Sequence, residues 1–203
     1  MAQVFPTKGN LMASKKSLDL ATMGFDLLDK KRNILTREMM SLIEAAQSIQ
    51  EQINEAYKKA YTSLQKANLT LGNCEETART EPVDNGLEID YRSVMGVEIP
   101  TVHLKDSPPS VSYMMNSTNS LLDKAYFDFY EVKKLTVKLC EIESSVYRLA
   151  NAISKTQKRA NALKNIVIPN YEKTIKFISE SLEEKEREDF SRLKVVKRQK
   201  EGK

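Results

Sequence analysis

The sequence is poor in the residues that compact domains use. It has no tryptophan, two cysteines, one histidine, six glycines and six prolines among 203 residues, and aromatic residues make up 7%. Charged residues make up 30%. This composition argues against a sandwich or an α/β core and favours long helices with much exposed surface. The two cysteines, Cys74 and Cys140, are too sparse for a disulfide framework, so we expect reduced thiols.

No group of residues predicts catalysis, a cofactor or a metal. The single histidine, His103, has no cysteine or second histidine at ligand spacing. Neither GxxxxGK[ST] nor GxGxxG occurs, so no phosphate-binding loop is predicted. The carboxylates of residues 183–189 would point around the whole circumference of a helix, which is typical of a solvated charged face. We therefore expect no catalytic, cofactor-binding or metal site, and a protein that is not an enzyme.

The sequence also argues against a membrane span and against nucleic acid. No apolar run approaches the roughly 18–20 residues that cross a bilayer, and the first twenty residues hold no continuous hydrophobic segment of a secretory signal. The net charge of +4 comes from 32 basic and 28 acidic residues and implies no nucleic acid by itself. The basic tail at 191–203 lacks interleaved aromatic residues and follows an acidic stretch that would repel a polyanion.

Two long stretches carry apolar residues at alternating spacings of three and four, the pattern of a coiled-coil seam. No glycine or proline interrupts the first stretch between Phe25 and Leu71, and a helix of some 55–60 residues would be roughly 85 Å long. The seam positions of the first stretch are Leu18, Ala21, Phe25, Leu28, Arg32, Leu35, Met39, Leu42, Ala46, Ile49, Ile53, Ala56 and Ala60. Those of the second are Leu122, Ala125, Phe129, Val132, Leu135, Leu139, Ile142, Val146, Leu149, Ile153, Thr156, Ala160 and Leu163.

Between these stretches the periodicity falls to two. Residues 87–95 and 97–104 predict two short strands with Gly96 near their turn. An isolated hairpin is marginal in water, so it should pack on the helices or on another chain. The predicted fold class is mainly α: a long antiparallel two-helix coiled coil with a small central β-hairpin and loop insert. We expect segments 1–71, 72–118 and 119–203, together forming one elongated unit.

The antiparallel pairing predicts a register. If Ala67 faces Leu121, then Arg32 lies opposite Thr156, and residues beyond about 188 have no partner helix within the chain. Arg32 interrupts the apolar seam, and two explanations are compatible. It fixes the register at some cost in stability, or it contacts a neighbouring chain.

Pro169 lies within the second helical stretch. A proline in a helix interior costs about 3 kcal/mol. The apolar face also slips by one residue there, because Leu163, Val167, Tyr171 and Ile175 are separated by fours. Such a slip is typical of a stutter, which unwinds a supercoil locally. We expect a bend or a straightening of one continuous helix. The alternative is that Pro169 begins a new helix in its first turn.

Both ends of the chain resemble one family, the D subunits of the V-type and A-type rotary ATPases. The C-terminal motifs are "TQKRANAL", the "IP" step at Ile168–Pro169, "TIKFI" and "EREDFSRLK". The N-terminal segment "PTKGNLMASKKSLDLATMGFDLLDKKRNIL" and the central "VMGVEIP" also resemble this family. One position departs from it, because Asp29 stands where the family pattern leads us to expect a basic residue.

The resemblance implies a non-catalytic central rotor shaft that couples ATP hydrolysis or synthesis to proton or sodium transport. It implies that both termini enter the hexameric catalytic head of A and B subunits. The central insert would bind the small F subunit of the stalk and the socket protein, the C or d subunit, that joins the shaft to the membrane rotor. The protein would be cytoplasmic and peripheral to the membrane, with no cofactor, no nucleic acid and no direct membrane insertion.

Specific residues are expected at these contacts. The basic residues expected in the bore of the head are Lys30, Lys31, Arg32, Lys158, Arg159, Arg187, Arg192, Lys194 and Lys197. Those expected to meet the small stalk protein or the socket are Val94, Met95, Gly96, Val97, Glu98, Ile99 and Pro100. Pro169 is expected to bend the helix. The alternative function is a generic coiled-coil adaptor or tether, which would explain the heptads but not the motifs at both ends.

Overall fold

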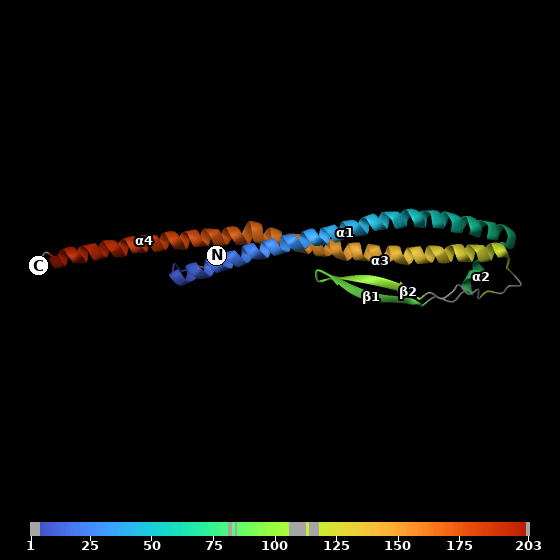
Figure 1. Ribbon diagram of the computed structural model, residues 1–203, viewed down its shortest axis with the longest axis horizontal. Coiled ribbons are helices and arrows are strands. Elements are labelled where there is room, and N and C mark those ends of the chain that lie inside the picture. Colours follow the sequence, from blue (N-terminus) through green and yellow to red (C-terminus); the bar gives the residue numbers. More distant parts are fainter. Residues whose placement is uncertain (1–4, 81–82, 84, 106–112, 114–117, 202–203) are drawn as a thin grey trace. The chain divides into compact units, whose positions relative to one another are not determined.

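A computed structural model describes residues 5–80, 83, 85–105, 113 and 118–201. The chain divides into two units. The terminal unit comprises Met1–Asn33 and Ser154–Lys203, and the central unit comprises Ile34–Ile153. Two helices, α1 (Lys8–Leu71) and α3 (Ser120–Ala162), contribute to both units (Figure 1). The predicted division into three segments stays a prediction. Those segments are consecutive in the sequence, whereas the two units are groups of residues in spatial contact.

The central unit pairs α1 with α3 and adds a short helix, α2 (Glu75–Arg79), and a β-hairpin (Figure 1). The strands β1 (Leu87–Val94) and β2 (Val97–Leu104) pair antiparallel, from Leu87 with Leu104 to Val94 with Val97. The predicted mainly α fold with a small two-stranded insert is confirmed.

A two-residue turn joins the strands. Met95 has a φ of 52° and Gly96 a φ of 76°. Positive φ at both central residues is the requirement of the type I′ turn, whose twist matches that of the flanking strands. Glycine adopts this conformation without strain, whereas methionine does so at some cost.

The hairpin packs on the paired helices through β2. Ile99 is 1% exposed and forms a core cluster with Leu35 and Leu149, which are fully buried. Val94 and Val97 pack against the same cluster from either side of the turn. Of the two surfaces expected to cover the hairpin, the structure therefore shows the helices of the same chain.

A second cluster confirms the predicted register in this unit. Ala67, Cys74 and Leu122 are buried together, with Leu121 packed against them. Tyr113 completes the cluster and donates its hydroxyl to Asp123 Oδ1 at 2.6 Å. The apolar pairing predicted for Ala67 and Leu121 is thus present near the end of α1 and the start of α3.

One buried polar residue beside the seam was not predicted. Asp128 is 6% exposed, while its neighbour Phe129, a predicted seam position, is half-buried and packs its ring against Tyr61 of α1. Ser63 donates a hydrogen bond to Asp128 Oδ2 at 2.6 Å, and Lys59 Nζ lies 3.0 Å from Asp128 Oδ1. A buried carboxylate is stable when it is paired and hydrogen-bonded in this way, and the pairing was invisible to a count of apolar residues.

The terminal unit is a second stretch of antiparallel helices. Here α1 faces the end of α3, then a π-helical segment η2 (Leu163–Val167) and α4 (Ile168–Glu201) (Figure 1). Gly24 lies against Leu163, Lys164 Nζ lies 5.7 Å from the ring centre of Phe25, and Arg32 bonds to Gln157. Arg32 therefore lies one residue from the predicted partner position, Thr156.

Small side chains occupy several of the most buried positions. Ala60, Ala67 and Ala125 in the central unit and Ala160 in the terminal unit are at most 1% exposed. An alanine at the interface lets two helix backbones approach closely, because the separation of packed helices depends on the side chains at the contact.

We predict that Asp128 contributes stability that is lost in acid. Burial by itself raises the pKa of this carboxyl, but hydrogen bonds from Ser63 and Lys59 and the charges of Lys59 and Lys124 outweigh burial and hold the pKa below its ordinary value. The contribution is therefore fully present above the unfolded value of about 3.9 and disappears as pH falls through the lower folded-state pKa. Denaturant unfolding at pH 7 should show Asp128→Asn to be less stable by about 1.5–3 kcal/mol.

Repeating that comparison down to about pH 3 should shrink the difference between Asp128→Asn and the wild type. Glu131→Gln is the matched control, since Glu131 lies 3.9 Å from Lys59 on the exposed side of the same pair. Its effect should stay within about 0.5 kcal/mol. A difference for Asp128→Asn that is constant over the whole pH range would contradict the assignment.

Candidate interaction surfaces

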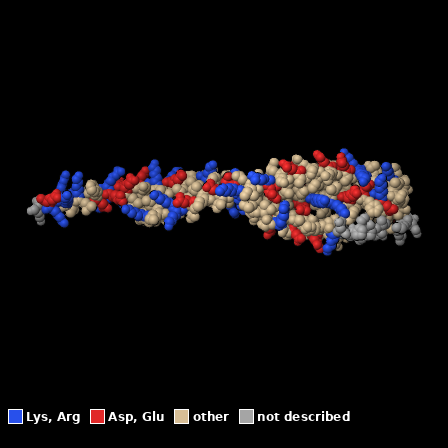
Figure 2. Space-filling model, in the orientation of Figure 1, with Lys and Arg blue, Asp and Glu red and all other residues tan. Residues whose placement is uncertain are grey.

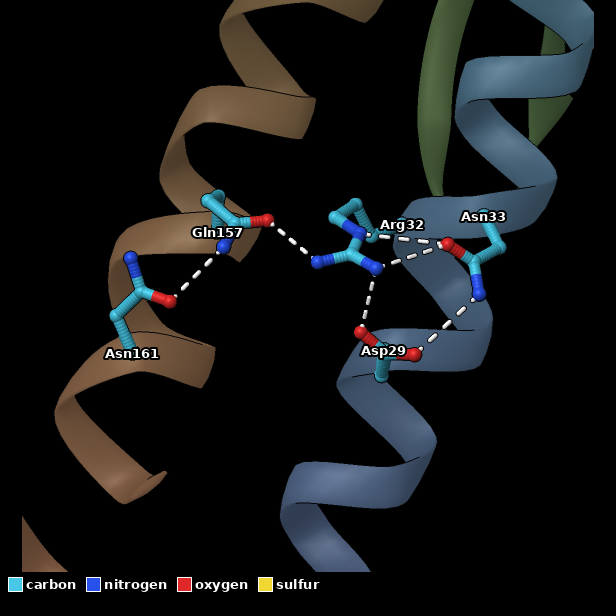
Figure 3. Close-up of polar contacts among 5 residues, drawn as sticks. All are labelled: Asp29, Arg32, Asn33, Gln157 and Asn161. Atoms are coloured by element: carbon cyan, nitrogen blue, oxygen red, sulfur yellow. Dashed lines mark hydrogen bonds and ion pairs between the residues drawn. The ribbon is translucent and has the colours of Figure 1, made fainter. Parts of the chain in front are cut away.

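A polar network joins the two helices of the terminal unit (Figure 3). The Arg32 guanidinium donates to Gln157 Oε1 at 2.8 Å, lies 2.7 Å from Asp29 Oδ1 and donates to Asn33 Oδ1 at 3.0 Å. Asn33 donates back to Asp29 Oδ2 at 3.3 Å, and Gln157 donates to Asn161 Oδ1 at 2.8 Å. The network thus runs from Asp29 on α1 to Asn161 on α3.

This network gives Arg32 hydrogen-bond and ion-pair partners within its own chain. The sequence predicted a contact with the head or a device that fixes the register, and the structure engages the guanidinium with acceptors of its own chain. Asp29, the position that departs from the family pattern, is one of these acceptors. Sequence reasoning missed Asn33, Gln157 and Asn161, although the interruption of an apolar seam by Arg32 was the signal to search opposite it.

The other basic residues expected in the head are at the surface. Lys30 is exposed and Lys31 half-buried on α1, while Lys158 and Arg159 are exposed on α3. Arg187, Arg192, Lys194 and Lys197 are exposed on α4. Figure 2 shows side chains of both signs exposed along α4, where an acidic stretch at 183–189 is followed by a basic stretch at 191–200. The role of these residues in the head stays a prediction.

Residues 183–201 of α4 are exposed along their whole length. Ion pairs at i,i+4 spacing join Glu183 to Arg187, Glu188 to Arg192 and Lys197 to Glu201. Such pairs each stabilise an isolated helix by about 0.2–0.5 kcal/mol. Phe190 and Leu193 are about two-thirds exposed on the same stretch. The segment therefore carries its own helical stabilisation and presents apolar side chains to the surroundings.

The central segment 94–100 is divided between core and surface. Ile99 and Pro100 are buried and Val94 and Val97 half-buried, so these residues hold the hairpin in place. Met95, Gly96 and Glu98 are exposed at and after the turn. Contact of this segment with another protein stays a prediction, and the exposed residues are the ones available for it.

A groove that the sequence did not predict lies between the hairpin and the helices of the central unit. It has a volume of about 620 Å³ and is mainly apolar. Ile89 and Val102 line it from the strands, and Tyr61, Phe129 and Val137 line it from the helices. Within the described residues, Leu87 and Ile89 of β1 remain about half exposed beside it.

Pro169 is the second residue of α4, and Ile168 separates it from the π-helical segment. The Ile168 N–H donates to the Leu163 carbonyl, five residues back, where an α-helix would use the carbonyl four residues back. A π turn therefore holds one residue more than an α turn. The predicted one-residue slip of the apolar face is confirmed, because the π turn accommodates one extra residue at this place. Ile178, which follows the π turn, is fully buried. The helix is continuous through Pro169, while a bend there stays a prediction.

We predict that the extra residue of the π turn is dispensable for folding. Deleting Asn165, which is exposed within η2, should convert the segment to a regular α-helix and leave the apolar positions on either side in phase. Urea unfolding should place this variant within about 1 kcal/mol of the wild type.

Deletion of Lys158, an exposed residue of α3 in the same unit, is the control. It should rotate every downstream side chain by about 100° and lose more than about 3 kcal/mol, because no π turn is present there to absorb the change. Equal destabilisation by the two deletions would show that η2 stores no removable residue.

Membrane-spanning helices and grouped metal ligands are absent from the described part of the chain. No helix there is both long and apolar enough to cross a lipid bilayer. No three histidine, cysteine, aspartate or glutamate side chains there are gathered as metal ligands would be. Cys74 is buried and Cys140 exposed, and both are free thiols.

The fold defines a class of protein in which long antiparallel helices carry a β-hairpin insert. A family model that describes the D subunit of ATP synthase matches residues 10–198. The D subunit of the V-type ATP synthase of Thermotoga neapolitana is 45% identical over 196 residues, which cover 96% of this chain and 97% of the relative. Two more distant relatives have a similar name.

The D subunit of the A-type ATP synthase of Pyrococcus horikoshii is 36% identical, with 96% of this chain and 94% of the relative covered. The protein of the same name from Methanobrevibacter smithii is 33% identical, with 95% and 85% covered. The chain belongs to the family of ATP synthase D subunits, and the resemblance seen at both ends of the sequence is confirmed.

Proposed function

We propose that this chain is the central-stalk rotor subunit of a V-type or A-type ATPase. The observation that carries the proposal is the family match from residue 10 to residue 198, which includes both long helices and the insert. The chain would then be a part of an ATP-driven ion-translocating complex, without a catalytic site of its own.

The partners follow from that placement. The terminal unit would enter the hexameric head of A and B subunits, with Lys30, Lys31 and the exposed cations of α4 facing its bore. The exposed residues of the hairpin turn, Met95, Gly96 and Glu98, would face the small F subunit or the socket protein, the C or d subunit. Such a chain would be cytoplasmic and peripheral to the membrane.

The helix pairing supports a mechanical role. Closures of the head around bound ATP would push on the shaft and turn it. Each unit is a pair of helices joined by buried apolar contacts and by at least one polar cross-link, Ser63 to Asp128 or Arg32 to Gln157. Twisting such a pair strains many contacts at once, so force applied at one level is transmitted along both helices.

Reconstitution tests the proposal. The purified full chain and its small stalk partner are mixed with a catalytic head that lacks a central stalk, and co-migration and ATP hydrolysis are followed together. We expect one copy of the chain per head and an altered rate of hydrolysis. If the folded chain does not associate, the rotor proposal fails and a generic coiled-coil adaptor becomes the better account.

A lengthened variant separates shaft from tether. Seven residues inserted after Lys15 and seven after Lys173 add about 10 Å to facing helices and keep the heptad phase. A tether should retain its activity with this insertion, whereas a shaft seated in a bore should lose coupled hydrolysis. The variant's helix content and unfolding midpoint are checked first, so that loss of activity is not loss of the fold.

Pro169 would give the shaft its asymmetry. We infer that the π turn and the missing N–H of Pro169 bend the helix, so that each protein of the head meets a different face of the axle. Replacing Pro169 with alanine should straighten the helix, raise stability by up to about 3 kcal/mol and change the ratio of ions transported to ATP hydrolysed. A crystal structure of the variant with unchanged curvature would refute the bend.

A further inference from the structure

We propose that Arg32, with Asp29 and Gln157, fixes the axial alignment of α1 against α3 in the terminal unit. These three residues are called the pin. The consequence for rotation rests on the proposed function, but the pin itself is a property of this chain. This role is one of the two compatible explanations that the sequence left open for Arg32, and a contact with the head stays a prediction.

The first step is the geometry of the guanidinium (Figure 3). Its planar fork places N–H groups in fixed directions. One arm reaches across to Gln157 at 2.8 Å, and another is held by Asp29 at 2.7 Å and Asn33 at 3.0 Å. Asn33 also bonds to Asp29, which fixes the carboxylate that orients the arginine. The donor that crosses to α3 is thus aimed from its own helix before it meets a partner.

The second step concerns the acceptor on α3, Gln157. Gln157 can accept through Oε1 only when its amide is turned toward Arg32, and its donation to Asn161 at 2.8 Å keeps that orientation. Thr156, the adjacent residue, is buried at 7% exposure. The pin therefore ends at the margin of a packed interface, and the bond from Arg32 to Gln157 is partly buried.

The third step compares the native register with registers shifted by one heptad. An apolar heptad seam repeats every seven residues, so sliding by one heptad restores much of its packing, and polar seam residues are what distinguish the registers. A slip of α3 by seven residues would place Ala150 or Lys164 opposite Arg32 in place of Gln157. Alanine offers no side-chain acceptor, and lysine brings a like charge. The pin therefore rejects both neighbouring registers.

A pin of this kind matters for a helix pair under torque. Twisting two helices about each other also shears them along their length, and apolar contacts resist sliding poorly because they have no direction. Hydrogen bonds depend on direction and distance, so they resist the first ångströms of a slip. Without the pin, part of each applied turn would be absorbed as sliding within the terminal unit.

Disulfide trapping on the isolated full chain tests this directly. In a Cys74→Ala, Cys140→Ser background, Gly24→Cys with Leu163→Cys reports the native register, since these positions face each other: a Cβ at Gly24 would lie 3.8 Å from Cδ1 of the Leu163 side chain. Gly24→Cys with Thr156→Cys reports a slip of one heptad. Each cysteine pair is introduced both into the chain with the native pin and into the apolar pin variant Arg32→Met, Gln157→Leu. The rate of intramolecular disulfide formation under a mild oxidant is then measured by mass spectrometry.

We expect the apolar pin variant to trap the slipped pair at least tenfold faster, to leave the native pair unchanged and to unfold at an equal or higher temperature. Lys30→Met with Lys158→Met, two exposed lysines near the same turns, is the control and should alter neither rate. Arg32→Lys, a milder change that keeps the charge but loses the fork, should give an intermediate rate.

Two outcomes would overturn the pin. If the slipped pair is trapped no faster, or if both pairs are trapped faster to the same extent, the network does not set the register. A lower melting temperature with unchanged trapping would reduce the network to an ordinary stabilising ion pair. None of these readouts involves another protein, so they are independent of the reconstitution that tests the rotor function.

Discussion

The axial alignment of α1 and α3 is the constraint on which the rest of the molecule depends. Burial of the apolar seam holds the helices together, but similar side chains recur along it, so burial alone does not choose one register. The hairpin needs that choice, because Ile99 packs between Leu35 of α1 and Leu149 of α3. A shift of either helix would divide this cluster. Directional contacts such as Ser63 with Asp128 and Arg32 with Gln157 supply the choice that apolar packing leaves open.

Periodicity predicted the fold well, since heptads and strand alternation are local features. The two long helices, the hairpin with Gly96 at its turn and the register near Ala67 all followed from spacing. The polar contacts did not, because they join residues far apart in sequence. Asp128 and Ser63 are separated by 65 positions, and nothing near Asp128 marks it as buried in preference to Phe129. Arg32 was visible as an interruption of the seam, but its acceptor Gln157 lies beside the expected Thr156. At Pro169 the slip in phase was visible, whereas the π turn that produces it depends on backbone hydrogen bonding that no side-chain pattern records.

The candidate surfaces divide into residues that hold the chain together and residues left for partners. Arg32, Ile99 and Pro100 were expected at contacts with other proteins and are engaged within the chain. Lys30, Met95 and the cations of α4 remain at the surface. A motif shared with a family thus contains both kinds of residue, and sequence resemblance alone does not separate them. The separation needed the positions of the acceptors around Arg32, which are Asp29 on the same helix and Gln157 on the facing helix.

The buried alanines determine how slender the helix pair is. Where Ala60, Ala67, Ala125 and Ala160 are buried, no large side chain separates the two backbones. The distance between the helix axes at these levels is therefore short. A leucine at any of these positions would widen the pair at that level and leave its outer surface chemically unchanged. At each of these levels the distance between the two helices is therefore set by side chains that neither solvent nor another protein can reach.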